Sequence, residues 1–250
     1  MAVHWDIRRY ARLSSTNDEL KQLALSGASE GAVVVSDGQT AGRGREGHQW
    51  FSPEGKGLYV SCLLRPSTAK SPLPTLTLMA GLAVCDAVER FVTIPPQLKW
   101  PNDIWLAGRK VGGILTELIA GAVTPLEEAV IIGIGMNINL RQDELPTELQ
   151  QSATSLAVVR GQPLDREIVL QDTLTALAAR YQAWCEKGWS TQRNDYDARH
   201  ALPGVRVRVA FGAEPLEGIV RGVDDAGALL LETAAGHIEP VIAGDVSLCS

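Results

Sequence analysis

The 250-residue sequence predicts an α/β protein, with helices packed on a mixed β-sheet and a small all-β unit at the C-terminal end. Apolar residues recur at helical spacing near 75–91 and 165–187. The runs 32–36, 58–64 and 129–139 are short and apolar, as expected of buried strands. The last fifty or so residues alternate short strand patterns with glycine-containing turns, which is typical of a separate β-structure.

The N-terminal part predicts one helix and two strands. The helix is expected to open within 13–19 and to run to about Ser26. Thr16 and Glu19 have the spacing of a capping box, which gives the threonine hydroxyl a structural function at the helix start. Buried strands are expected at 32–36 and 58–64, on either side of a glycine-rich segment.

The middle of the chain predicts a helix followed by a hairpin and a central strand. The helix covers roughly 75–91, with apolar residues at helical spacing. We expect 97–106 to be a single extended segment, which turns at 107–108 and pairs with 109–118. The segment 129–139 is apolar on both faces and is therefore expected at the centre of its sheet.

The C-terminal part predicts a long helix and then a small β-barrel. Asp165 is the expected N-cap, the helix runs to about Lys187, and Gly188 ends it. Its buried face is expected to comprise Leu170, Leu174, Leu177, Tyr181 and Trp184. Five short strand patterns follow, so we expect two domains, residues 1–199 and residues 200–250.

Composition narrows the class of protein. The formal net charge is −6, which argues against a nucleic-acid surface because phosphate binding needs clustered cations. The cysteines are widely spaced and are expected to be reduced thiols. No signal-peptide pattern is present, and Asp86 interrupts the longest apolar region, so no membrane span is expected. These features predict a cytoplasmic globular protein.

The most informative stretch is Gly-Arg-Gly-Arg-Glu-Gly at 42–47. Its glycines let the backbone approach a ligand closely, and its arginines suit carboxylate and phosphate oxygens. The stretch also matches the G-x-G-x-x-G pattern of dinucleotide sites, but a helix should then begin inside it. The sequence instead continues to a proline-containing turn and a second strand. An anion-binding loop is favoured, and a solvated glycine hairpin is the structural alternative.

Further polar residues lie beside glycines, prolines or strand ends, where a sheet presents groups to a ligand. Structural alternatives exist for each: a helix cap for 15–17, solvated lysines at 99 and 110, and a turn at 102–103. No Cys/His cluster has metal-ligand spacing, and no hydrolase elbow or P-loop occurs. The candidates are Ser15, Thr16, Asn17, Gln39, Arg43, Arg45, Lys99, Asn102, Asp103, Lys110 and Asn137.

The order of these motifs resembles the biotin protein ligases. The likeness consists of Ser-Thr-Asn at 15–17, the glycine–arginine segment within 39–50, Lys-Trp-Pro-Asn-Asp at 99–103, the segment 109–117 and Gly-x-Gly-x-Asn at 133–137. Each motif alone is weak, whereas five in the right order with plausible spacing are a strong signal. The resemblance covers almost the whole chain, including the C-terminal unit.

The resemblance implies a class II synthetase-like ligase fold followed by an SH3-like β-barrel. It implies a two-step reaction in which biotin and ATP, with Mg²⁺, give biotinyl-5′-AMP and pyrophosphate. A lysine on the biotin carboxyl carrier domain of a carboxylase, typically acetyl-CoA carboxylase, then displaces AMP. Mg²⁺ would arrive with ATP and would have no site formed by protein ligands alone. The resemblance leaves homodimerisation open.

Roles for individual residues are also carried over from the resemblance. Those implied in catalysis are Lys110, Arg45 and Asp103. Those implied in biotin binding are Ser15, Thr16, Asn17, Gln39, Arg43, Gly44, Arg45, Lys110 and Gly113. Those implied in binding ATP or the adenylate are Arg43, Arg45, Trp50, Lys99, Asn102, Asp103, Lys110 and Asn137. The residue types fit, because a carboxylate and a triphosphate repel each other and fixed cations are needed to bring them together.

Two other functions are compatible with a ligase-like fold. A lipoate or octanoate transferase would need an apolar tunnel rather than a hydrogen-bonded pocket, and a non-catalytic biotin-binding regulator would lack the cations. Only about a dozen residues precede the first motif, so no winged helix-turn-helix and no operator DNA binding are expected. Glu46 departs from the family pattern, which is often basic at that position.

Overall fold

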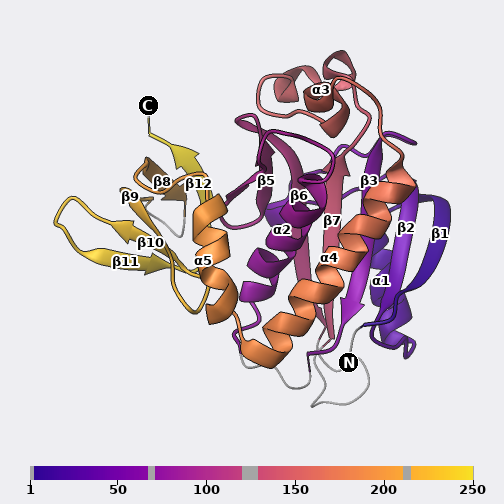
Figure 1. Ribbon diagram of the computed structural model, residues 1–250, viewed down its shortest axis with the longest axis horizontal. Helices are drawn as coiled ribbons and strands as arrows, with labels where there is room; N and C mark the ends of the chain where they lie inside the picture. Colours follow the sequence, from indigo (N-terminus) through magenta and orange to yellow (C-terminus); the bar gives the residue numbers. More distant parts are fainter. Residues whose placement is uncertain (1–2, 67–70, 120–128, 211–214, 250) are drawn as a thin grey trace.

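A seven-stranded sheet with helices on both faces forms the larger part of the computed structural model, and a five-stranded sheet lies beside it (Figure 1). The structure describes residues 3–66, 71–119, 129–210 and 215–249. The larger sheet has the strand order β1-β2-β3-β7-β6-β5-β4. Its strands are β1 (Asp6–Leu13), β2 (Ala32–Gln39), β3 (Gly57–Leu64), β4 (Gln97–Lys99), β5 (Asp103–Leu106), β6 (Arg109–Ile119) and β7 (Ala129–Asn137).

The mixed character of the sheet and its centre were both predicted correctly. Strands β1 and β2 pair in parallel, and the other neighbours pair antiparallel. Strand β7 hydrogen-bonds to β3 on one side and β6 on the other, and all of it except Gly135 is buried. A strand apolar on both faces needs cover on both faces, and helices provide it.

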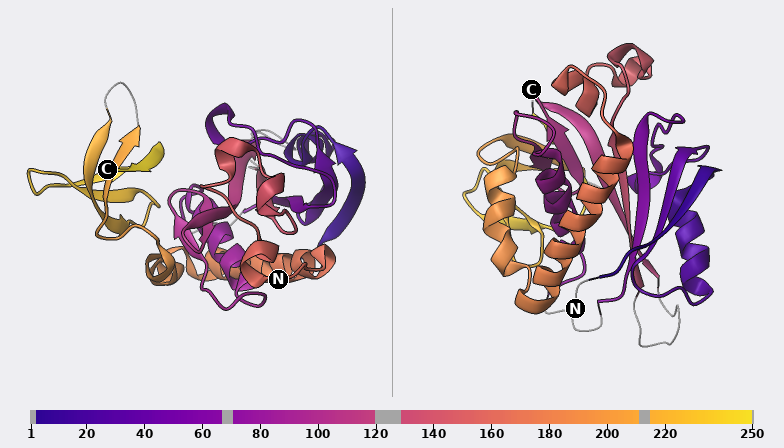
Figure 2. Two further views of the ribbon diagram at one scale, coloured as in Figure 1. Left: turned by 90° about the horizontal axis from the view of Figure 1, so that it is seen from above. Right: turned by 45° about the vertical axis from the view of Figure 1, so that its right-hand side comes forward.

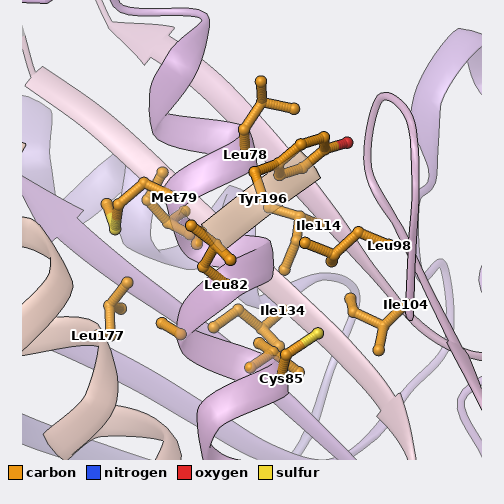
Figure 3. Close-up of a cluster of buried hydrophobic side chains, with 14 of the residues drawn as sticks. Leu78, Met79, Leu82, Cys85, Leu98, Ile104, Ile114, Ile134, Leu177 and Tyr196 are labelled. Carbon is orange, nitrogen blue, oxygen red and sulfur yellow. The ribbon is translucent and has the colours of Figure 1, made fainter. Parts of the chain in front are cut away.

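Two layers of helix cover the sheet (Figure 2). Helices α2 (Thr75–Val88) and α4 (Arg166–Lys187) lie on one face, and α1 (Thr16–Leu25) packs on β2, β3 and β7 from the other. Side chains of β7 alternate accordingly, so that Ile132 and Ile134 join the α2 side whereas Ile131 joins the α1 side. Figure 3 shows part of the hydrophobic core on the α2 side of the sheet. Its labelled residues include Leu78, Met79, Leu82, Ile114, Ile134 and Leu177.

Helix α4 has the predicted bounds. Its N-cap is Asp165, whose carboxylate accepts a hydrogen bond from the backbone N–H of Glu167 at 2.8 Å. It ends before Gly188, which has φ of 84°, and the five residues of its predicted buried face are all buried. Helix α2 ends at Val88, three residues before the predicted end at 91. None of the helices in the described part of the chain is long and apolar enough to cross a membrane.

The predicted capping box at the start of α1 is wrong. Ser15 is the N-cap, and no side chain in the described part of the chain caps the first turn. The Thr16 hydroxyl instead donates to Oε1 of Gln39 at 3.2 Å, and Glu19 accepts from the Tyr10 hydroxyl at 3.0 Å. Tertiary partners on the sheet displaced the local pairing, so the threonine hydroxyl faces the interior of the site.

The single extended segment predicted over 97–106 is also wrong. It folds back on itself as strands β4 and β5, which pair antiparallel with Lys99 opposite Asp103. Residues 100–102 make the turn, and Pro101 within it has no N–H for a sheet ladder. The hairpin matters for the site, because it brings a lysine and an aspartate of one motif side by side.

The number of C-terminal strands was predicted correctly, but their closure into a barrel was not found. They are β8 (Arg206–Ala210), β9 (Leu216–Val223), β10 (Leu229–Glu232), β11 (Ile238–Val241) and β12 (Asp245–Leu248). Their order is β11-β10-β9-β8-β12, all antiparallel, and among the described residues β11 and β12 do not pair to close a barrel. An open antiparallel sheet consistent with an SH3-like unit therefore replaces the expected closed barrel.

Two further helices and the first strand were not predicted. Helix α3 (Leu156–Arg160) is short, α5 (Ser190–Arg199) is mostly polar, and β1 has only three partly buried apolar positions. Helix α5 leads to the C-terminal sheet. The two parts of the chain are joined by hydrogen bonds from indole N–H groups, with Trp100 donating to Gly227 O at 3.0 Å and Trp189 to Asp224 O at 3.3 Å.

Candidate active site

A cavity of about 340 Å³ lies on the α1 face of the larger sheet. Its walls come from the start of α1, the glycine-rich loop, the β4–β5 hairpin and the strands β6 and β7, with Asp245 and Val246 of the C-terminal sheet at one side. Of the residues predicted from the sequence, those that line it are Ser15, Thr16, Asn17, Gln39, Arg43, Gly44, Arg45, Trp50, Lys99, Asn102, Asp103, Lys110 and Gly113.

Glycines on the central strand form the floor of this cavity. Gly133 and Gly135 follow Ile131 at alternate positions of β7, on the face that α1 covers. A Cβ atom at Gly133 would lie 2.2 Å from Oδ1 of Asn17, and one at Gly135 would lie 2.7 Å from Nε1 of Trp50. The floor is thus open because two successive side chains on that face are missing, and Asn17 and Trp50 approach the bare backbone.

Hydroxyl and amide groups form one connected cluster at the α1 end of the cavity. The backbone N–H of Thr16 donates to Oε1 of Gln39 at 2.8 Å, and the amide of Gln39 donates to the Ser52 hydroxyl at 3.0 Å. The Ser61 hydroxyl lies 2.8 Å from the Thr16 hydroxyl and 2.5 Å from Oδ1 of Asn17. These side chains are held by partners on three different elements, so their orientation is set before a ligand arrives. We call Thr16, Asn17, Gln39 and Ser61 the polar cluster.

Charged groups gather at the other end. Nζ of Lys110 lies 2.6 Å from Oδ1 of Asp103 and 5.5 Å from the centre of the Trp50 ring. Nζ of Lys99 lies 5.3 Å from the ring centre of Trp105. Burial lowers the pKa of Lys99, with a further lowering from Lys110 and opposing effects from Asp103 and Asp245. Because burial disfavours the charged form of Lys99, an anion placed next to its ammonium group would stabilise that charged form.

Two donors in the cavity wall have no acceptor. Nη1 of Arg45 and Nε1 of Trp50 are buried and have no hydrogen-bond partner within the described part of the chain. Leaving a buried donor unpaired costs about 1–3 kcal/mol, so such groups mark places where a ligand oxygen or nitrogen fits. Both residues come from the glycine-rich loop or its end and line the cavity, and Trp50 lies next to Lys110 and Gly135.

Two predicted residues have structural partners. The Asn102 side chain lines the cavity, but its amide donates to Ile114 O at 2.9 Å. Asn137 does not line the cavity, and its buried amide donates to Thr154 O at 3.0 Å. The amide at 102 thereby fixes the β5 end of the hairpin against β6, and the one at 137 fixes the end of β7.

Three residues at or near the site were not among the candidates selected from the sequence. Ser61 is a polar residue within an otherwise apolar strand, and that interruption was a usable signal. Glu117 accepts from the Asn17 amide at 2.6 Å, although an acidic residue near a strand end looks like solvated surface. Asp245 lies in the C-terminal sheet, more than a hundred residues after the cavity residues of the larger sheet. No local sequence pattern connects it with them.

The α/β fold thus carries a cavity with an uncharged hydrogen-bonding end, formed by the polar cluster, and a second end where Lys99 and Lys110 lie near Asp103. Comparison with known proteins identifies the family. Residues 10–137 match the model of the biotin/lipoate A/B protein ligase family, and residues 204–249 match the biotin protein ligase C-terminal domain. The chain belongs to the biotin/lipoate A/B protein ligase family, as the resemblance of its motifs predicted.

Individual relatives point to one branch of that family. The biotin–[acetyl-CoA-carboxylase] ligase of Mycobacterium tuberculosis is 36% identical over 94% of this chain and 86% of its own length. The ligase of the same name from Paracoccus denitrificans is 37% identical over 91% of this chain and 94% of its own. The structure of the biotin protein ligase from Aquifex aeolicus in complex with biotin and ATP superposes with a TM-score of 0.84, at 33% identity and 98% coverage of both chains.

Proposed function

We propose that this protein is a biotin protein ligase that activates biotin with ATP and then transfers it to a lysine of a biotin carboxyl carrier domain, typically that of acetyl-CoA carboxylase. The observation that carries the proposal is the juxtaposition of the polar cluster and the Lys110–Asp103 pair over the glycines of β7. Family membership and the biotin ligases among the relatives support the same function.

The polar cluster suits the head group of biotin. A ureido group has two N–H donors and one carbonyl acceptor, and it is uncharged. Hydroxyls of Ser15 and Thr16 and the amides of Asn17 and Gln39 line this part of the cavity and include both donors and acceptors. Ser15, Thr16 and Asn17 are each 5% exposed or less, so an ill-matched head group would leave buried polar atoms unpaired.

The cationic end suits the first chemical step. In that step a carboxylate oxygen of biotin attacks the α-phosphorus of ATP, the bond to the β-phosphate oxygen breaks, and pyrophosphate leaves. Lys110 and Arg45 provide positive charge where the carboxylate and the α-phosphate meet, and Lys110 is held in place by Asp103 before the reaction. Trp50, whose ring lies beside Lys110, provides a flat apolar surface for the adenine.

The residues present also fit a bound Mg²⁺. The carboxylates of Asp103 and Asp245 line the cationic end and are the oxygen ligands that this ion prefers, usually together with substrate phosphates. When bound with ATP, the ion would offset part of the triphosphate charge.

In the second step the acceptor lysine, as the free amine, attacks the acyl carbon of the mixed anhydride. An amide bond forms, the bond to the phosphate oxygen breaks, and AMP leaves. Water would compete with the lysine, so the glycine-rich loop that covers the cavity has a protective function.

The decisive experiment is biotin-dependent release of pyrophosphate from ATP, with and without a purified biotinyl domain. We expect release with biotin alone, none with lipoate or octanoate, and transfer of biotin to one lysine of the acceptor. Release with lipoate in place of biotin would favour lipoate chemistry. Tight biotin binding without any release would favour a non-catalytic regulator and contradict the proposal.

A further inference from the structure

Arg43 is the first arginine of the glycine-rich loop, and its guanidinium is already engaged by two carboxylates of the protein. Its Nη2 atom lies 2.6 Å from Oδ1 of Asp18 on α1 and 3.0 Å from Oε2 of Glu117 on β6. It also donates to Oε1 of Glu117 at 3.1 Å. The loop, the helix and the strand are far apart in the sequence, and a single side chain joins them at the edge of the cavity.

The charge balance at this point is unfavourable for binding a further anion. One guanidinium faces two carboxylates, so the three groups together carry net negative charge. Arg45 and Lys110 differ in this respect, since Arg45 has a buried N–H without an acceptor and Lys110 has one carboxylate partner. The two arginines of the loop therefore have different surroundings, although each follows a glycine in the sequence.

Glu117 connects this ion cluster to the polar cluster. Its Oε2 atom accepts from Nδ2 of Asn17 at 2.6 Å as well as from Arg43. The other end of the Asn17 amide accepts from the Ser61 hydroxyl. Both ends of the amide are thus occupied, and Arg43 holds in place the carboxylate that sets its orientation.

We infer that Arg43 is a positioning residue rather than a contact to the reacting anions: it fastens the glycine-rich loop to α1 and β6 through Asp18 and Glu117, and through Glu117 it orients Asn17 in the cavity. The effect of this role on biotin and the adenylate rests on the proposed function. The fastening itself is a property of the ligand-free protein. The side chains of Arg43, Asp18 and Glu117 are 40%, 47% and 26% exposed, so the ion pairs are accessible to salt.

Substitution of the carboxylates separates the two roles that Arg43 could have. Glu117→Gln retains an acceptor for Asn17 but removes one ion pair, and Asp18→Asn removes the other. If Arg43 fastens the loop, both variants weaken biotin binding by calorimetry and speed escape and hydrolysis of the adenylate, each about twofold to fivefold for ion pairs of this exposure. If Arg43 contacts the reacting anions, removing its competing carboxylates leaves biotin binding unchanged or tightens it.

A second measurement needs no enzymatic activity. Trypsin cleavage after Arg45, followed by mass spectrometry in ligand-free protein, reports how firmly the loop is held, and both variants retain that arginine. We expect faster cleavage in Glu117→Gln and Asp18→Asn than in the wild type, with smaller differences at high salt. Glu54→Gln is the matched control, because it removes the surface ion pair of Glu54 with Arg12, 2.6 Å long, outside the cavity.

The outcomes distinguish this inference from the proposed function. Absence of biotin-dependent pyrophosphate release in the wild type would contradict the function, while the cleavage comparison would still test the fastening. Unchanged cleavage in both variants would overturn the inference. Faster cleavage with unchanged biotin binding would overturn it too, because the ion cluster would then have no influence on the cavity. Arg43→Lys should restore part of the adenylate retention that Arg43→Ala loses.

Discussion

Nζ of Lys110 lies 2.6 Å from Oδ1 of Asp103, and these residues come from strands β6 and β5, which pair with each other. The carboxylate keeps the lysine side chain directed into the cavity while leaving its other N–H bonds available. A cation that is fixed before the substrates bind needs little reorganisation when charge develops, which is the condition for electrostatic stabilisation of a transition state. Under the proposed function, the pair holds a cation ready at this end of the cavity.

Replacing this lysine should affect catalysis far more than stability. Lys110→Ala is expected to slow adenylate formation about 10²–10³-fold, as for loss of one donor to a developing charge. Single-turnover formation of biotinyl-5′-AMP measures this directly. The neighbouring Arg109 is outside the cavity lining, so Arg109→Ala is the control and should remain near the wild-type rate. A loss of less than tenfold in Lys110→Ala would remove that residue from the catalytic role.

The glycine floor predicts separate effects at its two positions. Gly133→Ala would place a methyl group against the Asn17 amide, and Gly135→Ala would place one against the Trp50 indole. We expect the first to weaken biotin binding chiefly and the second to weaken ATP binding chiefly, each at least tenfold, since sub-3 Å contacts force the side chain to move. Calorimetric titration with each ligand checks this. Ile131→Val, on the same face outside the cavity, should change neither, and an identical pattern for both alanine variants would refute the division of the cavity.

A buried hydrogen bond between helices predicts a stability effect without an effect on the site. The indole N–H of Trp184 on α4 donates to the hydroxyl of Thr75 on α2 at 2.8 Å, and both side chains are fully buried. Thr75→Val should lower the free energy of unfolding by about 1–3 kcal/mol, because the indole N–H is left without an acceptor. Urea unfolding measures the change. The exposed Thr175→Val is the control, and equal effects of the two substitutions would contradict this account.

The buried imidazole of His200 predicts acid sensitivity. Burial lowers its pKa to about 4, from the usual 6.5, and neither ring nitrogen has a partner in the described part of the chain. As pH falls from about 6.5 to 4, the unfolded chain takes up a proton that the folded protein does not. The free energy of unfolding should therefore decrease over this range, by at most about 3 kcal/mol, and this contribution should change no further below pH 4.

Unfolding curves at several pH values test this expectation. His200→Phe keeps an aromatic ring beside Tyr196, whose ring centre is 5.5 Å away, and removes the titrating group. The variant should lose less stability between pH 6.5 and pH 4 than the wild type does. Parallel pH profiles for the two proteins would mean that other groups account for the acid sensitivity.

Sequence patterns predicted best those elements whose local and tertiary preferences agree. Helix α4 has a capping aspartate, a regular apolar face and a terminal glycine, and each of these acts within a few residues. Strand β7 is apolar up to its last residue, Asn137, so only a central position could bury it. Helix α5 and strand β1 escaped prediction because they are largely polar, and contacts with distant residues decide their structure.

The site was predictable only as far as its residues belong to short motifs. The segments 15–17, 39–50 and 99–103 each bring several cavity residues in one run of sequence. Glu117 and Asp245 reach the site through contacts with residues that are distant in the sequence. Local sequence patterns do not predict such contacts. The capping box is an error of the other kind, in which a local pattern was present but was not used. Thr16 and Glu19 have the right spacing, yet Thr16 donates its hydrogen bonds to Gln39, which is distant in the sequence.

The floor of the cavity has a consequence for how the protein moves. Gly133 pairs with Ser61 on one side and with Leu115 on the other, in the middle of three long strands. Its amide proton should exchange with solvent only when the whole sheet opens, whereas the loop over 42–50 is secured by a few backbone bonds and side-chain contacts. Ligand binding should therefore slow hydrogen exchange in the loop and leave the floor unchanged, so that the entropy cost of ordering falls on the loop alone.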